Sequence, residues 1–215
     1  MAKRRKVGNL LALVVLATLA ERPSHPYELA SLLRERGKDQ DLKIKWGSLY
    51  TVVQNLEKHG FIEAAASERQ GRRPERTVYA ITDSGRAELT DWLSELISVP
   101  EREHTRFQAA LSVLAVLGPD EAVALLAERS ATLDAEVDTH RSALAEYGKE
   151  LPRLFLIESE YELALRTAEA DWLREVVREL RDGSFPGVAQ WRTFHETGYL
   201  PPEVAAMAER GRVTE

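Results

Sequence analysis

The chain has 215 residues, 44% of them hydrophobic, which is enough to bury a real core and to form one or two domains. It contains no cysteine, which excludes a disulfide framework, a thiolate zinc site and a cysteine nucleophile. The net charge of −6 is unevenly spread: residues 1–95 hold 16 Lys and Arg against 13 Asp and Glu, and the remainder holds 13 against 22. The first half could therefore meet phosphates, whereas the acidic second half should face elsewhere.

The first predicted element is the apolar stretch from Leu10 to Ala20, which follows a basic start. A basic start and an apolar run resemble a secretory signal, but the run is too short for a membrane span, which needs about 20 residues. The alternative is a buried first helix with Asn9 as its N-cap and an exit before Pro23. We favour the buried helix because a small helical domain follows, and we expect a cytoplasmic protein without a membrane partner.

A second helix is expected from Pro26, which suits the first helical position, to Gly37, which ends it. Its expected buried face consists of Tyr27, Leu29, Ala30, Leu32 and Leu33. His25 directly precedes this helix, and we interpret it as a capping or phosphate-facing residue rather than a catalyst.

The third predicted helix lies in "GSLYTVVQNLEKHGFIE", residues 47–63, with Ser48 as a possible cap and Gly60 as a left-handed end. Its apolar stripe at helical spacing consists of Leu49, Val52, Val53 and Leu56. The opposite face carries neutral hydrogen-bonding groups and one cation: Thr51, Gln54 and Lys58, flanked by Tyr50 and Asn55. The single acid, Glu57, lies to the side. Such a face suits a helix that reads base edges.

Two strands are expected next, in residues 61–68 and 77–83, around a loop rich in arginine. The loop arginines are Arg69, Arg72, Arg73 and Arg76. Such a tip could lie along a groove or a row of phosphates, and the alternative is a solubilising loop that protects a sheet edge. Three helices followed by a hairpin predict a winged helix-turn-helix.

Three motifs in this order, "HPYEL", "GSLYTVVQNLEKHGFIE" and "GRRPERTVYAITDSGRAEL", resemble the PadR family of bacterial transcriptional regulators. The resemblance covers about residues 9 to 95. It implies a homodimer with an N-terminal winged helix domain and a helical C-terminal domain that pairs the subunits. It also implies a repressor that senses small molecules such as phenolic compounds or lipophilic drugs.

The second half is expected to be helical. Thr82 could cap a helix that stops at Val99-Pro100, and further helices are expected within residues 102–117, 119–150 and 152–183. The last two are long, and their expected apolar stripes are Val123, Leu126, Leu133, Val137 and Leu144 in one and Phe155, Leu163, Leu173, Val177 and Leu180 in the other. This pattern is typical of antiparallel helices that need another layer to bury their apolar stripes.

The expected fold is mainly α with an α+β wing. It comprises a winged helix DNA-binding domain with its linking helix (1–98), a helical dimerisation domain (99–184) and a C-terminal extension of unknown role (185–215). The extension carries Trp191, Phe194 and Tyr199 and departs from the family pattern. It could pack on its own domain or on a partner.

The expected function is that of a homodimeric, ligand-responsive repressor that binds a pseudo-palindromic operator. The alternatives are an architectural DNA-binding protein without an effector and a winged helix that has become a protein-interaction module. We do not expect an enzyme, a cofactor or a metal site, because no His-Glu-x-x-His pair, phosphate loop or nucleophile elbow is present. The nearest approach to a ligand cluster, Glu101, Glu103 and His104, suits a solvated helix start equally well.

The residues expected to contact double-stranded DNA lie on the second and third helices, between them and in the hairpin loop. They are His25, Tyr27, Lys45, Ser48, Tyr50, Thr51, Gln54, Asn55, Lys58, Arg69, Arg72 and Arg73. Trp92 is the candidate contact for a small lipophilic or aromatic effector. For both Trp92 and Trp172, packing in an apolar core is the default interpretation, and stacking on a ligand is the alternative.

Overall fold

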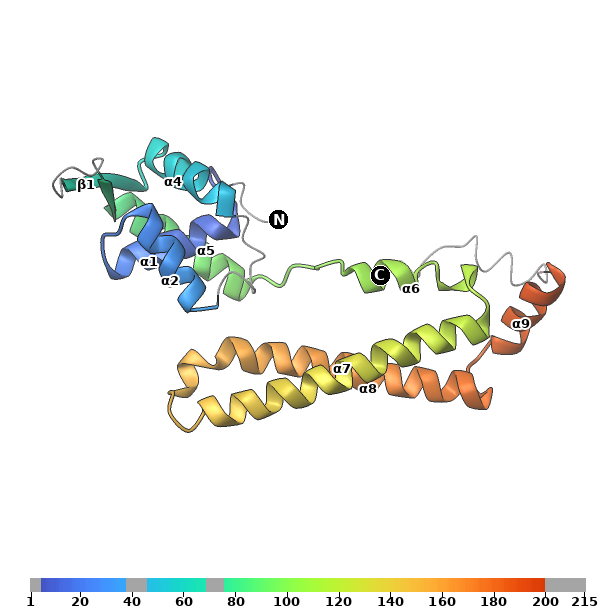
Figure 1. The fold of residues 1–215 in the computed structure, drawn as a ribbon. Helices are drawn as coiled ribbons and strands as arrows, with labels where there is room; N and C mark the ends of the chain where they lie inside the picture. The colour runs from blue at the N-terminus through green and yellow to red at the C-terminus, as the bar shows by residue number, and fades with distance from the viewer. Residues whose placement is uncertain (1–4, 38–45, 69–75, 200–215) are drawn as a thin grey trace. The chain divides into compact units, whose positions relative to one another are not determined.

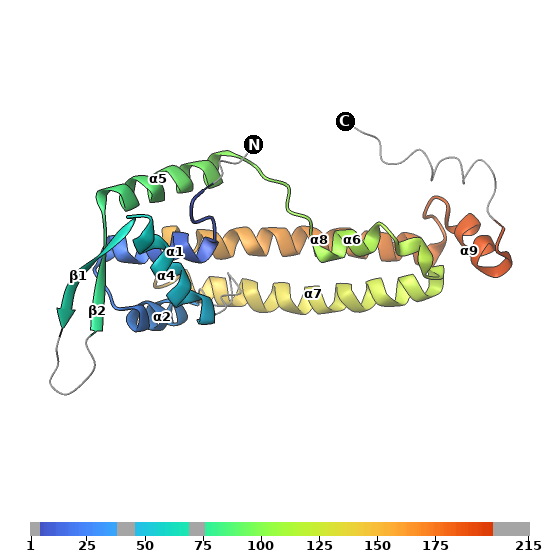
Figure 2. The same ribbon diagram turned by 90° about the horizontal axis from the view of Figure 1, so that it is seen from above.

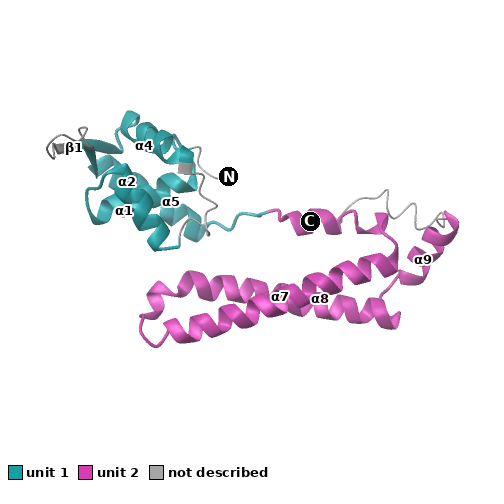
Figure 3. Cartoon of the chain, viewed as in Figure 1, with its two compact units in different colours: residues 1–103 teal, residues 104–215 magenta. Residues whose placement is uncertain are grey.

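The computed structural model describes residues 5–37, 46–68 and 76–199 (Figure 1). The chain divides into two compact units, residues 1–103 and 104–215 (Figure 3). Each unit has its own cluster of buried apolar side chains. The fold is mainly α with one small antiparallel sheet among the described residues, as the sequence predicts.

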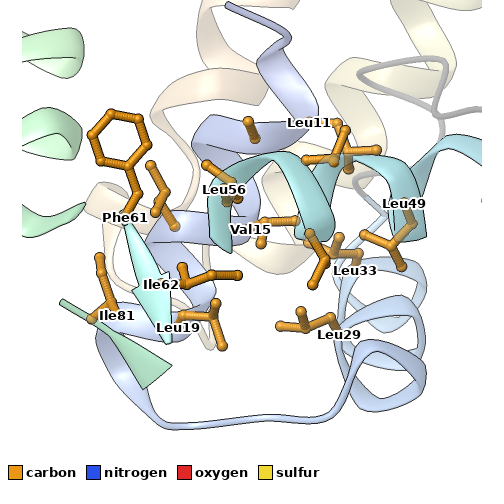
Figure 4. Packing of buried hydrophobic residues seen from close by; sticks show 14 of the residues in the cluster. Leu11, Val15, Leu19, Leu29, Leu33, Leu49, Leu56, Phe61, Ile62 and Ile81 are labelled. Atoms are coloured by element: carbon orange, nitrogen blue, oxygen red, sulfur yellow. The ribbon is translucent and has the colours of Figure 1, made fainter. Parts of the chain in front are cut away.

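Unit 1 is a winged helix-turn-helix with a linking helix. Its described elements are α1 (Leu10–Glu21), α2 (Pro26–Glu35), the 3-10 turn η1 (Trp46–Ser48), α4 (Leu49–Lys58), β1 (Ile62–Glu68), β2 (Arg76–Ile81) and α5 (Asp83–Ser98). Side chains from α1, α2, α4 and both strands converge on one core, in which Leu16, Leu29 and Leu56 are completely buried (Figure 4). This core holds the helices and the wing as one body.

Several of the predicted helix ends are confirmed. The Asn9 side chain accepts a hydrogen bond from the Leu11 amide at 2.9 Å, and Thr82 Oγ1 accepts one from the Gly85 amide at 3.1 Å. Gly60 follows α4 with a positive φ of 72°, the left-handed conformation that a residue without Cβ adopts at little cost. These local signals therefore set the limits of α1, α4 and α5.

The predicted cap at Ser48 is wrong. Ser48 makes no side-chain cap hydrogen bond to α4, and its φ and ψ of −88° and −12° are helical. A capping residue normally has extended backbone angles, and Ser48 instead belongs to the 3-10 turn η1 that leads directly into α4.

The wing is an antiparallel pair of strands in which Ile62 faces Ile81 and Ala64 faces Tyr79. The register shifts between Ala64 and Ala66, which is a bulge in β1. Ile62 and Ile81 both enter the core, so the base of the wing is anchored in unit 1.

Unit 2 is built on two long helices. Its described elements are α6 (Arg106–Leu111), the 3-10 turn η2 (Leu114–Val116), α7 (Pro119–Tyr147), the 3-10 turn η3 (Arg153–Phe155), α8 (Ile157–Asp182) and α9 (Val188–Thr197). Figure 2 shows α7 and α8 side by side, and Figure 1 shows the turn that joins them. Leu126, Leu133, Leu173 and Val177 are buried between them, which confirms the expected antiparallel pair.

Two expectations for unit 2 are wrong. Phe155 is not on the buried face of α8, because it lies in the turn before that helix and is 71% exposed. The segment 102–117 forms a short helix and a 3-10 turn instead of one helix. The Ser112 hydroxyl donates to the Ala109 carbonyl, and the β-branched Val113 and Val116 lower the helix propensity of this segment.

Helix α9 belongs to the segment 185–215 and packs on its own unit. The Trp191 indole N–H donates to the Leu117 carbonyl at 2.9 Å, and Arg192 pairs with Asp120 at 2.7 Å. Val188 is buried in the core of unit 2. The described part of the extension therefore covers the start of α7.

Gly85 is a point of close approach in unit 1. A Cβ at this position would lie 2.0 Å from the Phe61 carbonyl oxygen and 2.8 Å from Ile81 Cγ1. We expect Gly85→Ala to lower the free energy of unfolding of unit 1 by about 3 kcal/mol, as overpacking does. Urea unfolding measures this change. Gly47→Ala is the matched control, since a Cβ at Gly47 meets nothing within 4 Å, and equal stability of the two variants would contradict the prediction.

Candidate nucleic-acid interface

Helix α4 presents a polar face because its apolar face is used by the core. Leu49, Val52, Val53 and Leu56 are all buried. The side chains of Tyr50, Thr51, Gln54, Asn55 and Lys58 are all exposed. The face therefore offers amide and hydroxyl groups, which both donate and accept hydrogen bonds, and one ammonium group.

The start of α2 carries two further predicted contacts. His25 occupies the N-cap, where its Nδ1 accepts a hydrogen bond from the Tyr27 amide at 3.0 Å and its own amide donates to Glu28 at 3.1 Å. Since Nδ1 accepts, the neutral imidazole carries its proton on Nε2. The expected burial of Tyr27 is wrong: the residue is 64% exposed because the inward stripe consists of Pro26, Leu29, Ala30 and Leu33, and Tyr27 lies on another face of the helix.

The wing is tied to both helices through Tyr79. Its backbone exchanges two hydrogen bonds with that of Ser24, at 3.0 and 3.1 Å, and Ser24 immediately precedes the cap of α2. Its hydroxyl donates to Glu57 Oε2 of α4 at 3.3 Å. Burial, followed by the nearby Glu57 carboxylate, raises the pKa of the Tyr79 phenol. Because Tyr79 is bonded to Glu57 of α4 and to Ser24, the residue before the N-cap of α2, it joins the wing to the helix-turn-helix.

Four of the predicted DNA contacts, Lys45, Arg69, Arg72 and Arg73, lie outside the described residues. His25, Tyr27, Ser48 and the polar residues of α4 are described. They come from the start of α2, the turn η1 and α4, which share one core.

Trp92 is part of the unit 1 core and is only 4% exposed. The Arg5 guanidinium lies 5.3 Å from its ring centroid, within reach of a cation–π interaction. Arg5 also donates to Glu88 at 2.8 Å, to Asp91 at 2.9 Å and to Glu95. Burial lowers the pKa of Arg5, but these carboxylates outweigh it and hold the pKa above its ordinary value. A ligand that stacks on the ring would have to displace Arg5.

Trp172, the other tryptophan expected in a core, is 45% exposed in unit 2. It makes an edge contact with Phe107, whose ring centroid is 6.2 Å away. Its side of α8 therefore lies outside the core between α7 and α8.

Within the ranges that the structure describes, there is no group of three or more His, Asp or Glu side chains placed to hold a metal ion. No helix among the same residues is long and apolar enough to cross a membrane.

An exposed polar helix backed by a core and flanked by a strand pair defines a winged helix protein. Residues 15–91 match the sequence profile of the Transcriptional regulator PadR-like family. The match lies within unit 1 and covers about a third of the chain. This unit is therefore similar to the PadR-like family, which is a family of transcriptional regulators and not of enzymes.

Two similar proteins are also named transcriptional regulators. A probable transcriptional regulator of Mycobacterium tuberculosis is 35% identical over 88 residues, which cover 39% of this chain and 43% of that protein. The negative transcriptional regulator PadR of Bacillus subtilis is 28% identical over 114 residues, which cover 53% of this chain and 62% of that protein. The chain thus aligns with less than two thirds of either relative.

Solved structures extend the likeness in fold. Bacillus subtilis PadR in complex with operator DNA superposes with a TM-score of 0.65 at 21% identity, covering 80% of this chain and 99% of that one. The Vibrio cholerae virulence activator AphA gives a TM-score of 0.59 at 22% identity, covering 80% and 98%. At these identities the likeness shows the fold alone.

Sequence reasoning found the polar face of α4 but missed Tyr79 and Arg5. The spacing of the apolar residues in α4 predicts its buried face and, with it, the exposed face on the opposite side. Tyr79 looked like an ordinary aromatic residue of a strand, and Arg5 like part of a basic terminus. Their roles depend on Glu57 and on the acids of α5, which lie 22 and 83 to 90 positions away, so no local signal could find them.

Proposed function

We propose that this protein is a transcriptional regulator that binds an operator in double-stranded DNA and reads it with α4. The observation that carries this proposal is the exposed face of Tyr50, Thr51, Gln54, Asn55 and Lys58 on a helix whose other face is buried. Glutamine and asparagine side chains can form paired hydrogen bonds with adenine in the major groove, and lysine can reach guanine or a phosphate. The solved PadR of Bacillus subtilis in complex with operator DNA supports the same use of this fold.

We further infer that the protein is a repressor that responds to a ligand. Its relative in Bacillus subtilis is named a negative transcriptional regulator, and a solved structure of that protein is a complex with p-coumaric acid. A purely architectural DNA-binding role is less favoured because such proteins bind through a strongly cationic surface, whereas the net charge here is −6.

Gln54→Ala tests the reading helix. We expect the duplexes selected from a random pool to lose their preference at one position of each half-site, with affinity for the original operator reduced by about 1–3 kcal/mol. Selection followed by binding titrations with the wild type and the variant measures both effects.

Gln190→Ala is the matched control, because this exposed glutamine lies on α9 of unit 2. It should leave the selected sequence and the affinity unchanged. If Gln54→Ala behaved like this control, α4 would not be the reader. If the affinity for the duplex did not depend on salt concentration, a winged helix that binds protein would be favoured instead.

We propose that two copies pair through unit 2 to form a homodimer. Helix α8 has a second apolar face in addition to the one packed on α7: Ile157, Tyr161, Leu165 and Trp172 are all exposed, Tyr161 by 67%. Apolar faces at helical spacing that the chain itself leaves uncovered are typical of helices that pair with another copy. A dimer would present two reading helices to half-sites roughly one turn, about 34 Å, apart.

Tyr161→Glu combined with Leu165→Glu tests the pairing. Carboxylates on this face would be desolvated by a second copy, so we expect the double variant to sediment as a monomer and to bind the operator at least about tenfold more weakly. Analytical ultracentrifugation and binding titrations measure these outcomes. Thr139→Glu, on an exposed polar position of α7, serves as the control. A double variant that still dimerises would exclude this face.

We propose that a small lipophilic or aromatic effector acts near Trp92. A cavity of about 330 Å³ borders the ring, with the apolar side chains Leu10, Leu96 and Val99 in its lining. A bound effector can change operator affinity only if it binds the free and DNA-bound forms with different affinity. Such a compound should quench tryptophan fluorescence and weaken operator binding together. Quenching without any change in operator affinity would separate the site from regulation.

A further inference from the structure

Tyr79 is the point at which three elements of unit 1 meet. Through its backbone, β2 is bonded to Ser24, which is 1% exposed and stands next to the His25 cap of α2. Through its hydroxyl, β2 is bonded to Glu57 of α4 at 3.3 Å. The wing, the start of α2 and the reading helix are thus joined by one residue.

Glu57 is the acid that could disturb the reading face. It is the only Asp or Glu in α4, and it lies three positions after Gln54 and one before Lys58. Side chains three apart are neighbours on a helix surface, with Cβ atoms about 5–6 Å apart. An unrestrained carboxylate could accept the N–H groups that Gln54 needs for a base, and it would repel nearby phosphates.

We propose that Tyr79 is a positioning residue for DNA recognition: its phenol holds the Glu57 carboxylate on the wing side of α4 and so leaves the Gln54 amide free to contact a base. This inference rests on the proposed function of α4 as the reading helix. It assigns to Tyr79 an effect on base discrimination in addition to its packing against the core.

The environment of the phenol agrees with this role. The Glu57 carboxylate makes no other hydrogen bond or ion pair with the residues that the structure describes, so the Tyr79 hydroxyl is its one fixed contact there. Loss of the carboxylate should lower the pKa of Tyr79 towards its ordinary value, since Glu57 contributes to raising it. This effect provides a measurement that needs no DNA.

A double-mutant cycle tests the proposal. Tyr79→Phe keeps the ring and the backbone bonds to Ser24 and removes only the hydroxyl. We expect it to reduce affinity for the selected operator about three- to tenfold, as the loss of a partly exposed hydrogen bond of ordinary strength does, and to reduce discrimination against a scrambled duplex. In the Glu57→Ala background, Tyr79→Phe should have no further effect.

Controls separate positioning from simple stability. Tyr199→Phe and Glu63→Ala remove an exposed phenol and an exposed wing carboxylate that have no side-chain partner among the described residues, and both should leave binding unchanged. The melting temperature of Tyr79→Phe should stay close to that of the wild type. Nuclear magnetic resonance titration of the tyrosine rings should show a lower pKa for Tyr79 in Glu57→Ala.

The outcomes are distinct. If the wild type selects no duplex, the proposed function fails and this inference falls with it. If the wild type selects an operator but Tyr79→Phe binds it equally well, or loses affinity equally with and without Glu57, only the positioning role is overturned. A pKa of Tyr79 that does not respond to Glu57→Ala would also overturn it.

Discussion

Burial of one apolar stripe on α4 determines most of what unit 1 can do. Leu49, Val52, Val53 and Leu56 contribute about 1.5–3 kcal/mol each by leaving water, and they do so only if α4 packs on α1 and α2 with that stripe inward. The helix cannot turn about its axis without losing this energy. Its polar residues must therefore face outward, and the core fixes which of them do so.

The same core extends to the wing and to α5. Ile62 and Ile81 anchor the two strands, and Trp92 brings α5 into the cluster. Thr82 joins these parts locally: its amide donates to the Phe61 carbonyl at 3.0 Å, and its hydroxyl to the Gly60 carbonyl at 2.7 Å. Packed and hydrogen-bonded residues therefore connect the part of α5 that carries Trp92 to the end of α4. The effector proposal requires such a connection, because a ligand near Trp92 must affect α4.

The sequence predicted this fold well where local patterns and burial agree. Asn9, Thr82 and Gly60 act at the helix ends as their residue types suggest. The stripe of α4 is buried as its spacing suggests, and so are three residues of the α7 stripe, Leu126, Leu133 and Val137. The predictions failed where the adjoining chain segment formed a turn that the local pattern did not indicate. Ser48 does not cap because it is itself the last residue of a 3-10 turn, and Phe155 is exposed because α8 begins two residues later.

The candidate site also contains residues that the sequence predicted and contacts that it did not. Gln54 and Lys58 could be assigned from periodicity, because one helix determines which face each occupies. The contacts of Tyr79 with Glu57 and Ser24, and of Arg5 with three acids of α5, join segments distant in sequence and became visible only in the fold. Our further inference assigns one contact of this second kind, that of Tyr79 with Glu57, an effect on base discrimination.

The most direct test of the account is to map the protein surface that contacts a selected duplex, using backbone amide chemical shifts or hydrogen exchange with and without the DNA. The account predicts changes concentrated on the exposed face of α4 and at the start of α2, with α7 and α9 unaffected. Changes confined to unit 2, with α4 unperturbed, would contradict it.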